Sequence, residues 1–164
     1  MDPLSVSTVI SRPREEVFEY LADIANHAEF TDHYLTDWHL TREQSYGTGA
    51  GARFRIKAPF ARFAWADMTF TELDPPSRIV EHGRGGKYNR IRLLGTYTLK
   101  DGPEETTNVE YRFETRPVLP SDRLMEALGG RAWTRRQTAK AMRRLRAILE
   151  GSGERGVRPS ISGR

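Results

Sequence analysis

Six segments with the pattern of β-strands follow one another in the middle of the chain, and a turn sequence separates most of them. The separators at residues 47–51, 74–77, 83–86 and 101–103 are rich in Gly, Pro and Asp, which favour turns. Because links this short join neighbouring strands into hairpins, the pattern predicts an antiparallel sheet. The predicted strands are residues 38–42, 53–58, 63–73, 78–82, 90–100 and 107–116.

Helical patterns precede and follow these strands. After a β-branched strand at residues 5–10, apolar side chains recur at helical spacing over 13–23, and a second short helix is predicted at 26–34. The helical period returns over 121–150, where Gly129–Gly130 invites a kink or a break. One face of this long helix carries an apolar stripe. The stripe comprises Leu124, Leu128, Thr138, Met142, Leu145 and Leu149.

The resulting order is β-α-α-β6-α, an α+β fold with a seven-stranded antiparallel sheet. Only the long C-terminal helix is large enough to cover the inner face of that sheet. A curved sheet wrapped around one helix encloses space between them.

The chain has 164 residues, which fits a single domain over residues 1–150. Residues 151–164 have little apolar surface and are predicted to be a disordered, basic C-terminal tail. The absence of Cys excludes disulfides, Cys-ligated zinc, iron–sulfur clusters and a thiol nucleophile. We find no secretory signal pattern and no apolar run of membrane-spanning length, so a cytoplasmic location is expected.

Basic charge is concentrated at the C-terminal end. Residues 121–164 hold 11 Lys and Arg against 4 Asp and Glu, although the whole chain carries a net charge of only +4. Such an end can bind nucleic acid or an anionic membrane, or can form the solvated face of a helix. We favour the solvated face, because Trp133 is the only aromatic side chain among these basic residues.

The sequence resembles the START-like, Bet v 1-like (SRPBCC) superfamily, in its polyketide cyclase/dehydrase branch. The resemblance covers residues 4–150 and rests on four segments in the expected order. It implies a helix-grip fold with a ligand cavity between the sheet and the long helix. Many relatives have a Trp shortly after the first helix, where Phe30 stands here beside His33 and Tyr34. The four segments are residues 6–23, 71–80, 95–99 and 142–150.

Aromatic and aliphatic side chains alternate along the predicted strands and place one row on the inner face. At the position where this fold keeps its cavity, we expect these rows to bind a hydrophobic small molecule or lipid. The predicted ligand-binding residues are Tyr34, Met68, Phe70, Leu93, Tyr97, Val109, Tyr111, Phe113, Arg135 and Met142.

Polar residues are harder to assign to the inner face. Alternation from Phe70 turns Glu72 inward, whereas a one-residue change of register decides between Glu81 and His82. A regular helix would also point Arg131 and Arg135 at the sheet, where each would need an acidic partner or an anionic ligand. A register shift at the glycines would instead turn both outward and Trp133 inward.

Metal and nucleotide sites are not expected. His27, His33 and His39 recur every six residues, which suits neither a helix face nor a strand. The glycine-rich run 47–51 precedes a strand pattern rather than a helix, so it lacks the context of a nucleotide loop. We therefore expect no metal and no other cofactor.

Three functions follow, in order of preference. The first is a carrier that binds a hydrophobic molecule without turnover. The second is a polyketide cyclase or dehydratase that works without metal on a ligand in the same cavity, with Glu72, His82 or Tyr111 as candidate acid or base. The third is nucleic-acid binding. The sequence leaves a homodimer open.

Overall fold

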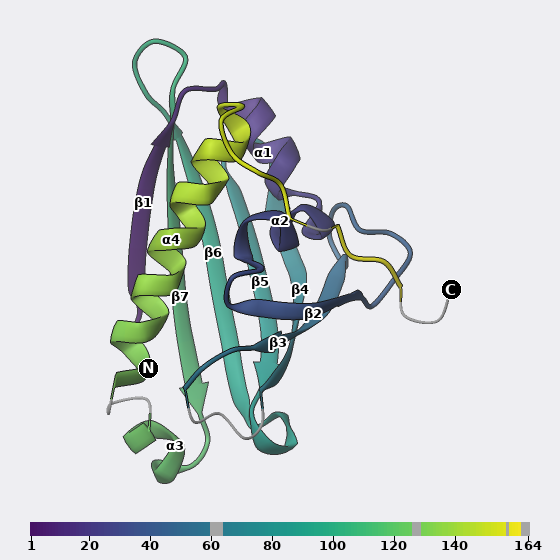
Figure 1. Cartoon of the computed structure of the whole chain (residues 1–164), viewed down its shortest axis with the longest axis vertical. Helices are drawn as coiled ribbons and strands as arrows, with labels where there is room; N and C mark the ends of the chain where they lie inside the picture. Colours follow the sequence, from purple (N-terminus) through teal and green to yellow (C-terminus); the bar gives the residue numbers. More distant parts are fainter. Residues whose placement is uncertain (60–63, 126–128, 157, 162–164) are drawn as a thin grey trace.

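The fold is a curved antiparallel sheet of seven strands in the order β1-β7-β6-β5-β4-β3-β2. The computed structural model describes residues 1–59, 64–125, 129–156 and 158–161 (Figure 1). This architecture confirms the predicted α+β helix-grip fold. The strands are β1 (Leu4–Ile10), β2 (Leu35–Leu40), β3 (Gly51–Ile56), β4 (Trp65–Asp74), β5 (Arg78–Gly85), β6 (Ile91–Asp101) and β7 (Thr107–Pro117).

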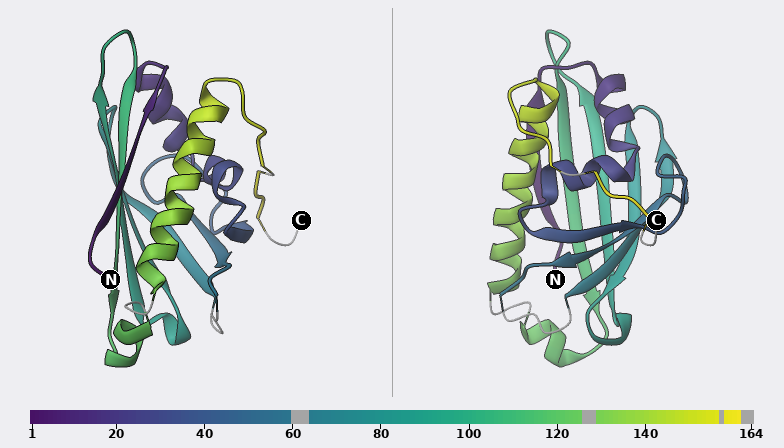
Figure 2. Two further views of the ribbon diagram at one scale, coloured as in Figure 1. Left: turned by 60° about the vertical axis from the view of Figure 1, so that its left-hand side comes forward. Right: turned by 45° about the vertical axis from the view of Figure 1, so that its right-hand side comes forward.

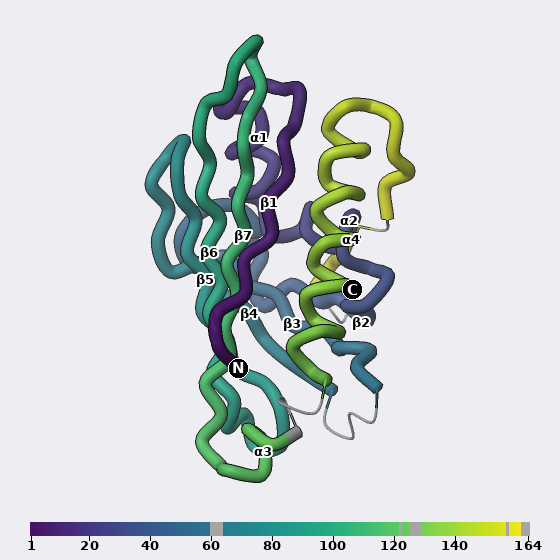
Figure 3. Tube along the Cα trace, turned by 90° about the vertical axis from the view of Figure 1, so that its left-hand side faces the viewer, coloured from purple at the N-terminus to yellow at the C-terminus, as the bar shows by residue number. Residues whose placement is uncertain are grey.

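The helices lie on one side of this sheet, as Figure 2 shows. The long α4 runs beside β1 and packs against α2, on one side of the sheet (Figure 3). Two 3-10 turns, η1 (Ile24–Asn26) and η2 (Lys87–Asn89), complete the elements. The α-helices are α1 (Arg14–Leu21), α2 (His27–Thr31), α3 (Pro120–Met125) and α4 (Arg131–Leu149).

The first helix forms where the sequence places it. Pro13 precedes its first turn, and Glu15 and Glu16 lie in that turn, where the helix dipole favours negative charge. The side chains of Val17, Phe18 and Leu21 recur on one face and are buried in the main core. This packing anchors one end of the sheet's inner face.

A β-bulge in β4 changes which side chains face the helix. The pairing with β5 runs regularly up to Phe70 and Glu81, then shifts by one residue so that Glu72 pairs with Val80. A bulge inserts one unpaired residue and so reverses the alternation beyond it. Glu72 therefore lies exposed and pairs with Arg78 at 3.0 Å. The prediction that it faces the interior is wrong.

The C-terminal helical segment is broken into two helices. The first, α3, ends at Met125 and α4 starts at Arg131, with Gly129 at φ 122° between them. Arg131 and Arg135 lie near the start of α4 and are exposed, whereas the stripe residues Thr138, Met142 and Leu145 that follow them are buried. Leu124 of α3 is exposed as well. Leu128 of the predicted stripe lies outside the described residues.

The chain after α4 turns back along α2 and reaches β2 (Figures 1 and 2). Arg155 pairs with the buried carboxylate of Glu29 at 3.8 Å, and Arg158 pairs with Asp23. The Ser160 carbonyl accepts a hydrogen bond from the Leu40 N–H. These contacts are polar and involve exposed arginines, so we expect residues 151–164 to add little to stability.

Candidate functional site

A cavity of about 260 Å³ lies between the inner face of the sheet and α4. Its walls come from α2, from strands β2 to β7 and from the first half of α4. Most of the wall is apolar, and eight of the lining side chains carry benzene or indole rings. The rings are those of Phe30, Tyr34, Trp38, Phe54, Tyr97, Tyr111, Phe113 and Trp133.

Seven of the ten predicted ligand-binding residues line this cavity. Phe70 and Val109 do not, because both lie fully buried in the core. Arg135 is exposed on the outer face of α4, so its assignment to the cavity is wrong. Trp133 takes the inward position, which is the alternative that a break at the glycines predicts. The seven lining residues are Tyr34, Met68, Leu93, Tyr97, Tyr111, Phe113 and Met142.

A carboxyl and a phenol meet inside this apolar wall. Glu81 on β5 is buried, and its Oε1 accepts a hydrogen bond of 2.6 Å from the Tyr111 hydroxyl on β7. Gly95 lies on β6, the strand between them, and its missing side chain makes this contact across two strand spacings possible. A methyl group at Gly95 would lie 2.7 Å from both the Tyr111 hydroxyl and Cγ of Glu81.

Burial shifts the protonation of both groups towards the neutral form. Desolvation raises the pKa of Glu81 to about 7, and the hydrogen bond from Tyr111 only partly opposes this. Burial and the nearby Glu81 raise the pKa of Tyr111 well above its usual value. The phenol therefore keeps its proton, while the carboxyl gains or loses one near neutral pH.

Two more phenols belong to the same cluster. The ring of Tyr97 lies 4.3 Å from that of Tyr111 between centroids. Tyr34 is hydrogen-bonded to Thr138 of α4, and its ring packs edge-on against Trp133. Burial raises the pKa of Tyr97 and of Tyr34, and the charge of Glu81 adds to the rise in both. The polar part of the cavity is thus a neutral cluster around one titrating carboxyl.

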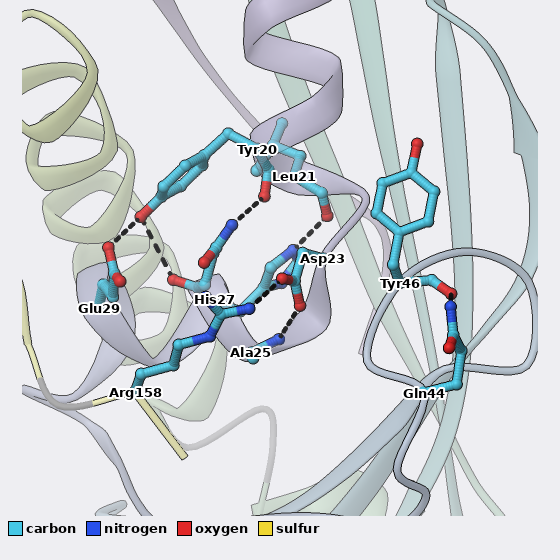
Figure 4. A network of polar contacts seen from close by, with 10 residues as sticks. Tyr20, Leu21, Asp23, Ala25, His27, Glu29, Gln44, Tyr46 and Arg158 are labelled. Carbon is cyan, nitrogen blue, oxygen red and sulfur yellow. Dashed lines mark hydrogen bonds and ion pairs between the residues drawn. The ribbon is translucent and has the colours of Figure 1, made fainter. Parts of the chain in front are cut away.

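His27 reaches the cavity from α2 but is held as a neutral ring. Its Nε2 donates a hydrogen bond of 2.8 Å to the Leu21 carbonyl, as Figure 4 shows, and its ring packs against Phe70 and Tyr97. Full burial lowers its pKa to about 4. His27 is therefore uncharged wherever Glu81 titrates.

The other histidines occupy separate surroundings. His33 contacts the Gln137 carbonyl and Arg144, and His39 stacks on Trp65. His82 is exposed on the outer face of β5, so it is not the acid or base of the cavity. Among the described residues, no three His, Cys, Asp or Glu side chains are grouped so that they could hold a metal ion.

Sequence reasoning missed Trp38 and Thr138 as lining residues, and it left Trp133 and Glu81 each as one of two alternatives. Alternation from Ile79, which is fully buried, places Glu81 on the inner face. A further signal lies in β6, where Gly95 pairs with Glu81 and leaves room for it. On α4 the predicted stripe residues Thr138, Met142 and Leu145 are buried, but the stripe does not reveal that Arg135, near the start of that helix, is exposed.

No helix in the described part of the chain is long and apolar enough to cross a membrane.

Together the sheet, the long helix and the cavity between them define a helix-grip protein with an internal, mainly apolar site. The chain belongs to the family described as polyketide cyclase / dehydrase and lipid transport, whose model matches residues 1–150. No curated protein sequence matches the chain.

Solved structures share this fold at low sequence identity. The protein TTHA0849 from Thermus thermophilus is 12% identical, with a TM-score of 0.70 over 92% of this chain and 98% of the other. The KanY protein is 13% identical, with a TM-score of 0.73 over 91% and 97%. DynU16, from the dynemicin biosynthetic locus, is 19% identical, with a TM-score of 0.58 over 95% of this chain and 50% of its own. At these identities the likeness establishes the fold alone.

Proposed function

We propose that this protein binds a hydrophobic small molecule or lipid in the cavity between the sheet and α4. The observation that carries the proposal is an apolar, largely aromatic wall interrupted by one polar cluster around Glu81 and Tyr111. Ligand sites have this composition, because apolar walls provide affinity and a few polar groups provide orientation. The family description, which includes lipid transport, agrees with it.

Filling the cavity tests this proposal. Ala141 lines the cavity on α4, whereas Ala132 is exposed on the same helix. Ala141→Leu is expected to weaken binding of the neutral dye Nile red at least about tenfold, since added methylenes occupy ligand volume. Ala132→Leu is the matched control and should bind as the wild type does. Equal dye affinity in both variants would place the dye elsewhere and contradict cavity binding.

Catalysis in the same cavity is the second candidate, and Glu81 is the observation that favours it. A buried carboxyl with a pKa near neutrality can serve as a general acid or base. Glu81 thereby replaces Glu72 and His82 as the candidate, since both of those are exposed. Tyr111 would act beside it by holding the carboxyl in place.

Substitution of this pair separates the carrier from the enzyme. Ligands that co-purify with the protein are first identified by mass spectrometry. In a carrier, Tyr111→Phe changes affinity by about 0.5–1.5 kcal/mol, the net value of one hydrogen bond, and no product forms. In an enzyme, Glu81→Gln lowers turnover about 10²–10⁴-fold while affinity changes little. We expect the first result.

A further inference from the structure

The side chains that line the cavity can supply negative charge but no positive charge near neutral pH. Among the described residues that line it, Glu81 is the only acidic side chain, His27 is the only other ionisable side chain apart from tyrosines, and none is Lys or Arg. His27 is neutral and its Nε2 proton is already donated to Leu21. The many arginines of α4 do not supply a counter-ion, as Arg131, Arg135 and Arg143 lie exposed on its outer side.

An anionic ligand would therefore lose its hydration without gaining a counter-ion. Burial of an unpaired charge in such a setting is costly, and the Glu81 carboxyl would add repulsion whenever it is ionised. A free fatty acid, a phosphate ester or any carboxylate fits this wall poorly. The apolar body of such a molecule would fit, but its charged end would not.

The geometry of the pair decides what kind of polar group fits instead. Tyr111 donates its hydroxyl proton to Oε1 of Glu81, so that oxygen already has a donor. Because the phenol keeps its proton, the proton of the neutral carboxylic acid belongs on Oε2. Glu81 lines the cavity, so this acid can donate to an oxygen atom of a ligand.

We propose that the cavity selects uncharged ligands that present a hydrogen-bond-accepting oxygen, a carbonyl or a hydroxyl, to the carboxylic acid of Glu81. This inference rests on the proposed function, since it names the class of ligand for the same cavity. The raised pKa of Glu81 supports it, because the acid form then persists to about pH 7. The charged or titrating groups that face Glu81 are Tyr34, Tyr97 and Tyr111, and burial keeps all three protonated in this range.

Four naphthalenes of nearly equal shape test the selectivity at pH 6. They are 2-acetylnaphthalene with a carbonyl, 2-ethylnaphthalene without a polar end, 2-naphthoate as an anion and 2-naphthylmethylamine as a cation. Binding to the full chain is followed by fluorescence or calorimetry. We expect the ketone to bind about three- to tenfold more tightly than the hydrocarbon, the contribution of one hydrogen bond. The carboxylate should bind at least about 30-fold more weakly than the ketone.

Other results would contradict the inference. Saturable binding of the hydrocarbon, with the carboxylate bound as tightly as the ketone, would overturn the inference and leave the proposed function intact. Tighter binding of the amine than of the ketone would also overturn it, because Glu81 would then act as a counter-ion. If none of the four binds while a phosphate- or carboxylate-bearing lipid does, the inference fails and the proposed binding of a lipid stands. If neither the naphthalenes nor such a lipid binds, the proposed function fails as well.

Variants of Glu81 assign the selectivity to this side chain. Glu81→Leu is expected to reduce ketone affinity to that of the hydrocarbon. Glu81→Gln keeps a donor and the partner of Tyr111, so it should hold ketone affinity within about threefold at pH 6. At pH 8, where the wild-type carboxyl is ionised and repels an anion, the same variant should bind the carboxylate about tenfold more tightly than the wild type does. Glu72→Gln removes an exposed carboxylate and is the matched control. Should the leucine variant fail to fold, the glutamine variant decides: carboxylate binding equal to that of the wild type at pH 8 would overturn the role of Glu81.

Discussion

Glu81 and Gly95 face each other as Cα partners on β5 and β6, and the missing side chain of Gly95 is what admits the Glu81–Tyr111 hydrogen bond. A methyl group at Gly95 would lie 2.7 Å from both the Tyr111 hydroxyl and Cγ of Glu81, well inside contact distance. The strands themselves would tolerate alanine, so the conflict lies in the cavity wall rather than in the sheet.

Gly95→Ala is therefore predicted to separate the pair. Overpacking in a buried site costs about 1–3 kcal/mol of unfolding free energy, measurable by chemical denaturation. Thr96→Ala, at the neighbouring position on the opposite face of β6, is the control and should cost less. If Gly95→Ala is as stable as the wild type and binds the ketone unchanged, the proposed role of Gly95 in admitting the Glu81–Tyr111 hydrogen bond is contradicted.

Stability should depend on pH through Glu81. Its pKa rises from 4.5 in the unfolded chain to about 7 in the folded protein. Its stabilising contribution to the free energy of unfolding is therefore fully present below pH 4.5 and is lost as pH rises through 7. The loss is on the order of 3 kcal/mol at the usual conversion of pKa to free energy. His27 acts in the opposite direction, because folding lowers its pKa from 6.5 to about 4. Its stabilising contribution is present above pH 6.5 and is lost as pH falls through 4.

The difference in unfolding free energy between the wild type and Glu81→Gln isolates the effect of Glu81, because His27 is present in both proteins. Denaturant unfolding at pH 5 and pH 8 should show Glu81→Gln gaining stability relative to the wild type at the higher pH. A difference that does not change with pH would refute the raised pKa.

Substitutions at two nearby positions on α4 test which side chain faces the cavity. Trp133 lines the cavity and Arg135 is exposed, so Trp133→Ala should weaken 2-acetylnaphthalene binding about tenfold or more, through lost aromatic contact. Arg135→Gln should leave affinity within about twofold. The reverse ranking would restore the interpretation in which the arginine faces the ligand.

Removal of residues 151–164 tests how much the C-terminal segment contributes. Its ion pairs with Glu29 and Asp23 involve arginines whose side chains are 63% and 56% exposed, and such pairs contribute little. Truncation after Glu150 should lower the melting temperature by less than about 5 °C, the shift that roughly 1–2 kcal/mol produces in a domain of this size. A larger drop would assign the segment a structural role.

The fold could be predicted because its signals are local and repeated. Alternation on β6 and β7, Pro and Gly at the turns and the apolar spacing of α1 all act on near neighbours in the chain. The inward rows Leu93 and Tyr97 or Tyr111 and Phe113 follow directly from a period of two.

The site is harder to predict because it depends on tertiary details. One bulged residue in β4 turns Glu72 outward, and Arg135 near the start of α4 is exposed although Thr138 and Met142 on the same helix are buried. Such shifts depend on pairing and packing with distant elements, which a local pattern does not record. Glu81 is distinguishable from His82 only through the buried Ile79 and the opposing Gly95, both tertiary facts.

The methionines offer the most direct test of binding in the cavity. Met68 and Met142 line it, whereas Met1 lies at the N-terminus outside it. In protein labelled with ¹³C at the methionine methyl groups, titration with 2-acetylnaphthalene should shift the Met68 and Met142 signals together, saturably, and leave the Met1 signal in place. Saturable binding that shifts Met1 and leaves Met68 and Met142 unmoved would contradict a ligand site between the sheet and α4.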